Sequence, residues 1–254
     1  MAEGQFKLRV AYPKSGRLRF LGHLEFLRTA DRCIRRSGLP FAVTQGFKPH
    51  MRIAFTGALP LGTASREEYY DVVLNEYVPA EIALEQLRRA TPPDLLPFAA
   101  GYVDMREPSL EAWLNRSWWH LHFKEGFVDE HELASTLESL VGEGSIEYMR
   151  GKKLRTVNLE QTLVSWELGA SDADFDYAEH YPYVLRVATR SGQDGSLRPQ
   201  LLLAQALERM GCPHTVDEIV YPLRHKLAHE TEKGSLIDAL SRCTGACARA
   251  EADR

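Results

Sequence analysis

The chain has 254 residues, of which 44% are hydrophobic and 26% charged, and its formal net charge is −4. This length and apolar content are sufficient to fill the cores of two ordinary domains. No run approaches the roughly 20 apolar residues of a membrane span, and the first ten residues contain no apolar signal core. We therefore expect a soluble, globular, cytoplasmic protein without a membrane partner.

The net charge hides an uneven distribution along the chain. Residues 7–52 contain eleven Lys or Arg but only two acidic residues, a local charge of +9, so the remaining residues carry −13. Such asymmetry favours a polyanionic partner near the N-terminal third. The alternative is a solvated basic face that acidic residues elsewhere in the molecule balance.

The first 106 residues show strand and helix patterns in the order β-α-β-β-α-β. Alternation predicts a strand over "FKLRVAYPK" that continues, or restarts after a turn at Lys14-Ser15-Gly16, over "RLRFLGH". A helix follows over "LEFLRTADRCIRR", with Gly22 or His23 at its N-cap and Gly38 with Pro40 at its end. The order is completed by a glycine-interrupted extended stretch from Phe41, the strand "EEYYDVVLN", the helix "PAEIALEQLRRA" and the strand "LLPFAAGYVDM".

The same order of elements recurs from Trp118 without any repeat of residues. We predict an α+β fold of two tandem ferredoxin-like domains, each with two helices on one face of an antiparallel sheet. The first domain would span residues 1–106 and the second residues 116–228, joined by a linker at 107–115. Small residues and one weak helical stretch predict a mobile tail over 229–254.

Arginines at spacings of three and four lie along one side of the first predicted helix: Arg28, Arg32, Arg35 and Arg36. We call these four residues the basic ridge. Arg17 and Arg19 would leave one face of the preceding strand. Guanidinium groups suit phosphate oxygens, and the amides that open the helix near His23 would add donors for an anion. We therefore favour RNA or another phosphate-rich ligand over pairing of the ridge with acidic residues of the same chain.

The stretch Gly46-Phe47-Lys48-Pro49-His50 predicts a rigid loop that faces the ligand. Gly46 permits unusual backbone angles, and Pro49 makes the residue before it extended. Phe47 would pack or stack on a base, Lys48 would contact a phosphate and His50 would make a polar contact. A purely structural turn is the alternative. The complete set expected to bind RNA is Lys14, Arg17, Arg19, His23, Arg28, Arg32, Arg35, Arg36, Lys48, His50 and Arg52.

Residues 12–74, from "YPKSGRLRFLGHLEFLRTADRC" to "EEYYDVVL", resemble the radical SAM-linked protein family, a domain of unknown function encoded beside or fused to radical SAM proteins. The family's small capping residue followed by His-Leu-acid matches Gly22-His23-Leu24-Glu25, with glycine in place of the usual serine. The segment is more distantly similar to the CRISPR repeat-associated RNA-processing proteins, which pair two ferredoxin-like domains. The resemblance implies a radical SAM partner and an RNA-like ligand, and it carries over no catalytic residue.

From these observations we expect an RNA-binding adaptor, not an enzyme, that presents an RNA such as tRNA or rRNA to a radical SAM modifying enzyme. One alternative is a metal-independent RNA endonuclease that uses His23 or His50 to move the proton of the 2′-hydroxyl. Another is a pure protein-interaction subunit of a radical SAM enzyme.

We expect no cofactor. A radical SAM cluster needs three cysteines in Cys-x3-Cys-x2-Cys, and Cys243 with Cys247 supplies two. The spacing of four in His225 with His229, and again in the two cysteines, resembles a zinc ligand set in reversed order, but such spacing arises easily by chance. His120 and His122 alternate on a predicted strand and are not among the expected site residues.

Overall fold

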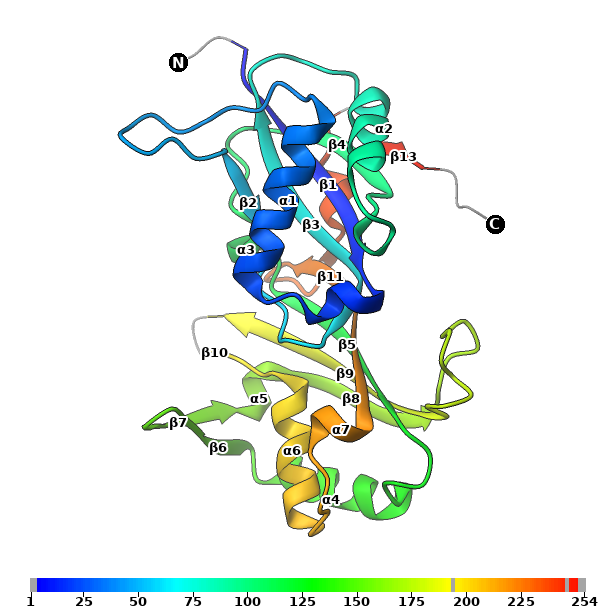
Figure 1. The fold of residues 1–254 in the computed structure, drawn as a ribbon. Coiled ribbons are helices and arrows are strands. Elements are labelled where there is room, and N and C mark those ends of the chain that lie inside the picture. The colour runs from blue at the N-terminus through cyan, green and yellow to red at the C-terminus, as the bar shows by residue number, and fades with distance from the viewer. Residues whose placement is uncertain (1–3, 193–194, 245–246, 251–254) are drawn as a thin grey trace. The chain divides into compact units, whose positions relative to one another are not determined.

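The computed structural model describes residues 4–192, 195–244 and 247–250. The chain forms two compact units (Figure 1). Unit 1 contains residues 1–114 and 226–254, and unit 2 contains residues 115–225. Strand β11 (Val220–Glu230) leads from unit 2 back into unit 1, so unit 1 is built from both ends of the sequence. The predicted α+β class is confirmed.

Unit 1 has the predicted β-α-β-β-α-β order. Its antiparallel strands are arranged β4-β1-β3-β2, as in a ferredoxin-like fold. The six elements are β1 (Phe6–Lys14), α1 (His23–Ser37), β2 (Ile53–Phe55), β3 (Ala64–Leu74), α2 (Ala80–Ala90) and β4 (Ala99–Val103). Shorter elements are η1 (Gly16–Phe20), η2 (Pro93–Leu95), α3 (Leu110–Trp113), β12 (Leu236–Ile237), η3 (Ala239–Arg242) and β13 (Ala248–Arg249).

Helices α1 and α2 cover one face of this sheet (Figure 1). Because successive strand side chains point to opposite faces, Leu8 and Val10 of β1 meet the helices together. They pack with the apolar stripe of α1, which includes Phe26, Ala30 and Ile34. Burial of this stripe leaves the opposite side of α1 in solvent.

The other face of the sheet is also covered, which the sequence did not predict. Ala11, Tyr69 and Ala99 are fully buried there, against Leu110 of α3 and Leu240 of η3. An uncovered apolar face would cost free energy, so residues at the C-terminal end fold onto it. The sequence predicted a plain linker at 107–115 and a mobile tail at 229–254, and the described residues of these two segments include α3, β12, η3 and β13.

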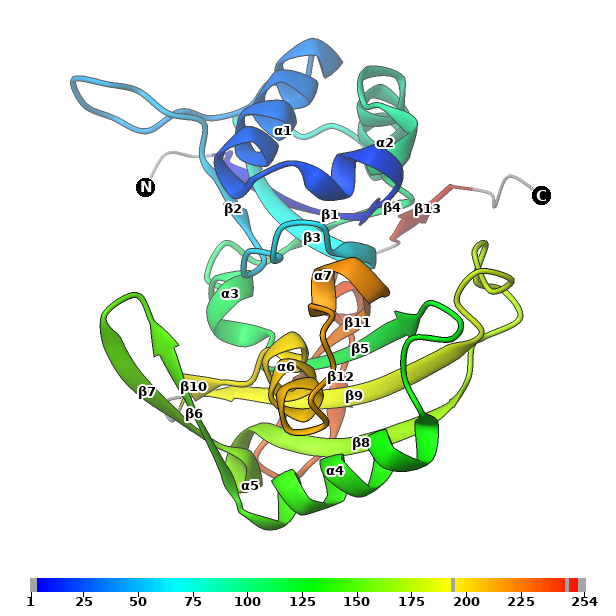
Figure 2. The ribbon, with the colours of Figure 1, turned by 60° about the horizontal axis from the view of Figure 1, so that its bottom comes forward.

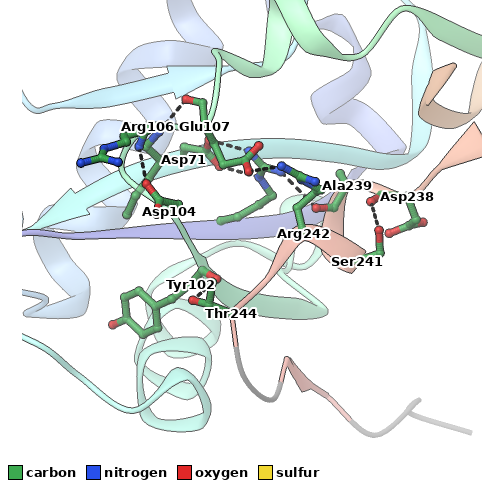
Figure 3. Close-up of polar contacts among 12 residues, drawn as sticks. Asp71, Tyr102, Asp104, Arg106, Glu107, Asp238, Ala239, Ser241, Arg242 and Thr244 are labelled. Atoms are coloured by element: carbon green, nitrogen blue, oxygen red, sulfur yellow. Dashed lines mark hydrogen bonds and ion pairs between the residues drawn. The ribbon is translucent and has the colours of Figure 1, made fainter. Parts of the chain in front are cut away.

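Polar contacts join the C-terminal segment of unit 1 to its N-terminal segment (Figure 3). Arg9 donates from Nη1 to the carbonyl oxygen of Ala239 over 3.0 Å, and the backbone amide of Thr244 donates to the carbonyl oxygen of Tyr102 over 2.7 Å. Arg242 forms an ion pair with Glu107. Strand β13 then pairs with β4, which extends the sheet by one strand.

Unit 2 repeats the ferredoxin-like arrangement, with sheet order β8-β9-β5-β11. In Figure 2, α4 and α6 lie against this sheet. The elements are β5 (Arg116–Phe123), α4 (Glu130–Gly142), β8 (Leu163–Ala170), β9 (Tyr183–Gly192) and α6 (Pro199–Arg209), with the additions α5 (Leu159–Thr162), β10 (Gly195–Ser196) and α7 (Val216–Ile219). A separate two-stranded hairpin, β6 (Ser145–Arg150) and β7 (Lys153–Asn158), is inserted after α4. Predicted strands over "IEYMRG" and "TLVSWELG" correspond to β6 and β8.

Candidate functional site

Helix α1 presents the basic ridge in the way that the helical spacing predicts. Gly22 is the N-cap, and its amide donates to the carboxylate of Glu25 over 3.1 Å, which stabilises the first turn. Gly38 ends the helix in the left-handed conformation, with φ of 76°. All four ridge arginines are exposed on the side of the helix that faces solvent.

The ridge arginines differ in their partners. Arg35 is held by Asp31, with 2.7 Å between Nε and Oδ2, and its guanidinium also lies over the ring of Phe41. Arg36 donates to the carbonyl oxygen of Ala90 over 3.2 Å. Arg28 and Arg32 have no hydrogen bond or ion pair within the part of the chain that the structure describes. Their guanidinium groups can therefore bind an anion without breaking a hydrogen bond or ion pair of the described structure.

The stretch around Gly46 forms a projecting hairpin, which we call the finger loop (residues 43–50) and which extends away from α1 and β2 in Figure 1. Its base is closed by Thr44, whose amide donates to the carbonyl oxygen of His50 over 2.8 Å and whose hydroxyl accepts from the amide of His50 over 3.0 Å. Gly46 has φ of 133°, a backbone angle that favours glycine. Phe47 is 100% exposed, and Lys48 and His50 are also exposed.

The region before α1 differs from the prediction. Residues 16–20 form the 3-10 helix η1 instead of a continued strand, so Arg17 and Arg19 do not share one face. Gly16 adopts a left-handed φ of 49°, and an added Cβ would lie 2.4 Å from the carboxylate of Asp94. The backbone angle and the lack of space for a Cβ both favour glycine where the chain leaves β1. Arg17 is exposed, whereas Arg19 is half-buried with its guanidinium over the ring of Phe20.

A small pocket opens beside the N-terminus of α1, lined by Tyr12, Lys14, His23, Phe26, Phe55, Thr56, Gly57, Ala58, Leu59 and Glu68. Lys14 lines this pocket, is 5% exposed and donates from Nζ to the carbonyl oxygen of Leu21 over 3.2 Å. The buried carboxylate of Glu68 accepts hydrogen bonds from Thr56 and Ser65. Exposed His23 lines the same pocket. The sequence indicated Lys14 and His23 but not Glu68, which lies in an ordinary strand pattern.

The last predicted contact, Arg52, lies at the foot of the finger loop. It is half-buried, and its guanidinium donates to the side chain of Gln5. The ridge, the finger loop and the pocket thus all belong to unit 1.

Unit 2 contains a histidine cluster that the sequence interpretation left out. His120 and His122 lie two residues apart on β5, so both leave the same face of the strand, and both are buried. His120 Nδ1 lies 2.9 Å from Asp172 Oδ2, and its ring stacks on His225 with 4.4 Å between centroids. Burial and the neighbouring His225 lower the pKa of His120 to about 4, so this imidazole is neutral at physiological pH. The His-x-His spacing was the available signal.

Among the described residues, His225, His229, Cys243 and Cys247 do not form a group that could bind one metal ion. The spacing of four would suit a helix, but His225 and His229 lie on strand β11, where four residues span about 13 Å. The ring of His229 stacks on Trp113, and its Nδ1 lies 2.7 Å from the Trp113 carbonyl oxygen. Cys243 and Cys247 lie against Gly101 of β4.

The chain belongs to the family described as "Uncharacterized protein conserved in bacteria (DUF2344)", whose family model matches residues 7–199. No curated protein matches the sequence significantly. The family description does not mention radical SAM or CRISPR proteins, so those resemblances stay predictions. Within the described residues, no helix is long and apolar enough to cross a membrane.

Among solved structures, the chain is similar to a chain from the "Crystal Structure of a Cbf5-Nop10-Gar1 Complex", with 12% identity and a TM-score of 0.45 over 89% of this chain. It spans only 50% of that chain. It is also similar to an unknown protein from Galdieria sulphuraria, with 12% identity and a TM-score of 0.25 over 89% of this chain and 99% of the other. A third similar structure is that of a putative glycine cleavage system transcriptional repressor, with 8% identity and a TM-score of 0.22 over 87% of this chain and 98% of the other.

Proposed function

Starting from a family whose description assigns no activity, we propose that this protein binds RNA through the basic ridge and the finger loop of unit 1. The observation that carries the proposal is the exposure of Arg28 and Arg32 on α1, without acidic partners among the described residues, in a segment that also exposes Phe47 and Lys48. Guanidinium groups bind phosphates in a bidentate manner, and an exposed aromatic ring stacks on a base.

An open surface with two arginines lies beside the ridge. An open groove between α1 and α2 is lined by Thr29, Arg36, Ser37, Gln86, Arg89, Ala90, Thr91 and Pro92. Arg36 and Arg89 add positive charge, although Arg89 is paired with Glu85. Basic grooves with nearby aromatic side chains are typical of single-stranded nucleic-acid binding.

The covered second face of the sheet also favours the helical side of unit 1. Many small α+β domains bind RNA on aromatic side chains of an open sheet. Here Tyr69 and its neighbours on that face are buried under α3 and η3. In unit 1 the exposed basic side chains of α1 therefore offer the more accessible surface.

Filter binding of labelled poly(U) and bulk tRNA tests the proposal. If four phosphates are neutralised on a single strand, affinity should fall about 50-fold between 50 and 200 mM salt. Arg28→Ala/Arg32→Ala should weaken binding at low salt and reduce the slope of log affinity against log salt by about 1.4. Arg106→Ala/Arg249→Ala, which removes the same charge from exposed positions of unit 1 outside α1, is the matched control. No retention of either RNA, or equal effects of the two double variants, would overturn the proposal.

We propose further that the bound RNA is presented to a radical SAM modifying enzyme, as the resemblance of residues 12–74 implies. Purified protein and a purified radical SAM protein from the same genome should associate more tightly when RNA is present. Association that is unchanged by nuclease treatment and by Arg28→Ala/Arg32→Ala would instead indicate a pure protein-interaction subunit.

The pocket beside α1 supports a second candidate, metal-independent RNA cleavage. His23 lines a pocket that also contains Lys14 and Glu68, which are groups able to move a proton and to stabilise a phosphate charge. His50 lies outside this pocket, at the exposed base of the finger loop. Incubation with labelled RNA in the presence of a chelator should then give cleavage that is lost in His23→Ala and kept in His50→Ala.

A further inference from the structure

Two histidines and one aspartate of unit 2 lie close enough to bind one ion. The ligand atoms of His120, His122 and Asp172 all lie within 4.8 Å of one another. Both histidines leave one face of β5, and Asp172 follows β8, which pairs with β9 beside β5. We propose that these three side chains form a binding site for a divalent first-row transition metal ion such as zinc.

The distances require only small side-chain movements. Ligand atoms bound at about 2.1 Å around a tetrahedral ion are about 3.4 Å apart. His120 Nδ1 and Asp172 Oδ2 are 2.9 Å apart, so an ion that displaces the proton between them would separate them slightly. Two imidazoles with one carboxylate are a ligand set for zinc and for iron(II).

Neighbouring groups orient each ligand as metal sites require. The hydroxyl of Ser171 donates its proton to the carbonyl oxygen of Tyr181 over 2.6 Å. The Ser171 oxygen, which lies 2.9 Å from His122 Nδ1, must therefore accept a hydrogen bond from that nitrogen. This contact places the proton on Nδ1 and leaves Nε2 of His122 as the metal ligand. The His122 ring also stacks on Phe175 with 3.7 Å between centroids.

Arg186 positions the carboxylate. Its Nη2 donates to Asp172 Oδ1 over 2.6 Å and to the carbonyl oxygen of Ala170 over 2.9 Å, while Asp172 Oδ2 faces His120. The positive charge of Arg186 reduces the attraction for a cation, but it also fixes the oxygen that would bind. Three protein ligands leave a coordination position for water or a substrate, which is typical of catalytic sites and not of structural ones. The Asp172 side chain is 27% exposed, so an ion can enter from solvent.

Zinc uptake by the chelator-stripped full-length protein tests this site. After dialysis against zinc and then buffer, elemental analysis should find one zinc per chain, and competition with a zinc-binding dye gives the affinity. Asp172→Asn, which keeps the shape but removes the charge, should weaken binding at least about 100-fold, and Ser171→Ala should weaken it about tenfold. Circular dichroism verifies that each variant is folded, and Ser171→Ala keeps the test decisive if Asp172→Asn does not fold.

Matched controls locate the ion. His214→Asn changes a histidine of unit 2 that lies 4.0 Å from Glu218 and outside the cluster, and it should bind zinc like the parent. Cys243→Ser/Cys247→Ser should also bind normally. The proposal is overturned if the stripped parent takes up no zinc, if folded Asp172→Asn and Ser171→Ala both keep the parent's affinity, or if the cysteine variant alone loses the metal. None of these results depends on RNA binding.

Discussion

At the scale of single residues, Arg9 and Asp71 form a deeply buried ion pair in unit 1. The two side chains are 1% and 5% exposed, and both carboxylate oxygens of Asp71 accept from the guanidinium, at 2.8 and 2.9 Å. Asp71→Asn should therefore lower the free energy of unfolding by about 3–5 kcal/mol, because it leaves the Arg9 charge buried without its counter-ion. Urea unfolding measures this loss.

Asp31→Asn is the surface control for that experiment. It breaks the pair with Arg35, whose side chains are 49% and 35% exposed, and it should cost less than about 1 kcal/mol. The double variant Arg9→Met/Asp71→Leu should recover part of the stability, since neither buried charge remains. Equal losses in Asp71→Asn and Asp31→Asn would contradict the assignment of Arg9 as a desolvated charge.

The thiol of Cys243 gives a prediction on pH dependence. Burial and the neighbouring Cys247 raise the pKa of Cys243 to about 12. At pH 8 only about one thiol in ten thousand is then ionised, against about a quarter for an ordinary cysteine. Alkylation by iodoacetamide, followed by mass spectrometry, should be at least about tenfold slower than that of free cysteine at pH 8. The rate should keep rising up to pH 10, where free cysteine has levelled off; a plateau near pH 9 would be inconsistent with this environment.

At the scale of elements, variants in the finger loop distinguish a role in RNA binding from a purely structural role. Phe47 is fully exposed and makes no contribution to the core. Phe47→Ala should leave the melting temperature unchanged and weaken RNA binding by about 1–3 kcal/mol through lost stacking. Lys48→Ala should weaken binding and lower its salt dependence, also without loss of stability. If His50→Ala melts far below the parent while Lys48→Ala has no effect on RNA binding, the loop is a structural turn.

Local patterns predicted an element well where its own residues determine its structure. The helical spacing of Arg28, Arg32 and Arg36 and the capping positions Gly22 and Gly38 correctly placed α1 and its exposed side. His120 and His122 were not among the expected site residues, although residues two apart on a strand share one face. The partner Asp172, however, comes from a loop about 50 residues away, and no local pattern indicates which loop meets which strand.

Local sequence patterns mispredict the structure where tertiary contacts override local preference. Residues 16–20 alternate like a strand, yet they form η1, and Gly16 at its start has a left-handed φ that strands do not use. The segment after Glu230 has weak helical and strand patterns, and its structure depends on an apolar sheet face formed more than 100 residues earlier. The apolar residues of that face can be recognised in a single sequence, but the segment that covers them cannot.

At the scale of the whole molecule, unit 1 is completed only when the chain returns from unit 2. Its sheet is covered on one face by α1 and α2 and on the other by α3 and η3. An RNA-binding helix needs a rigid base, because a mobile helix would lose entropy on binding. The C-terminal segment contributes no ridge residue, but in the proposed function it would support RNA binding by keeping the sheet under α1 rigid.

Removal of this cover should destabilise unit 1 selectively. Leu240 is 6% exposed and packs on the second face of the sheet, whereas Leu236 is 53% exposed. Leu240→Ala should cost about 2–5 kcal/mol of unit 1 stability, and Leu236→Ala, the matched control, should be close to neutral. Deletion of residues 231–254 should have a larger effect, because Arg9 then also loses its hydrogen bond to the carbonyl oxygen of Ala239.

Hydrogen exchange measures where the stability is lost. In Leu240→Ala and in the deletion, β1, β3 and α1 should exchange faster than in the parent, whereas β5 and β9 should be unchanged. RNA affinity should fall in the same order as stability. Equal exchange in both units, or an unchanged unit 1, would show that the segment does not support the sheet.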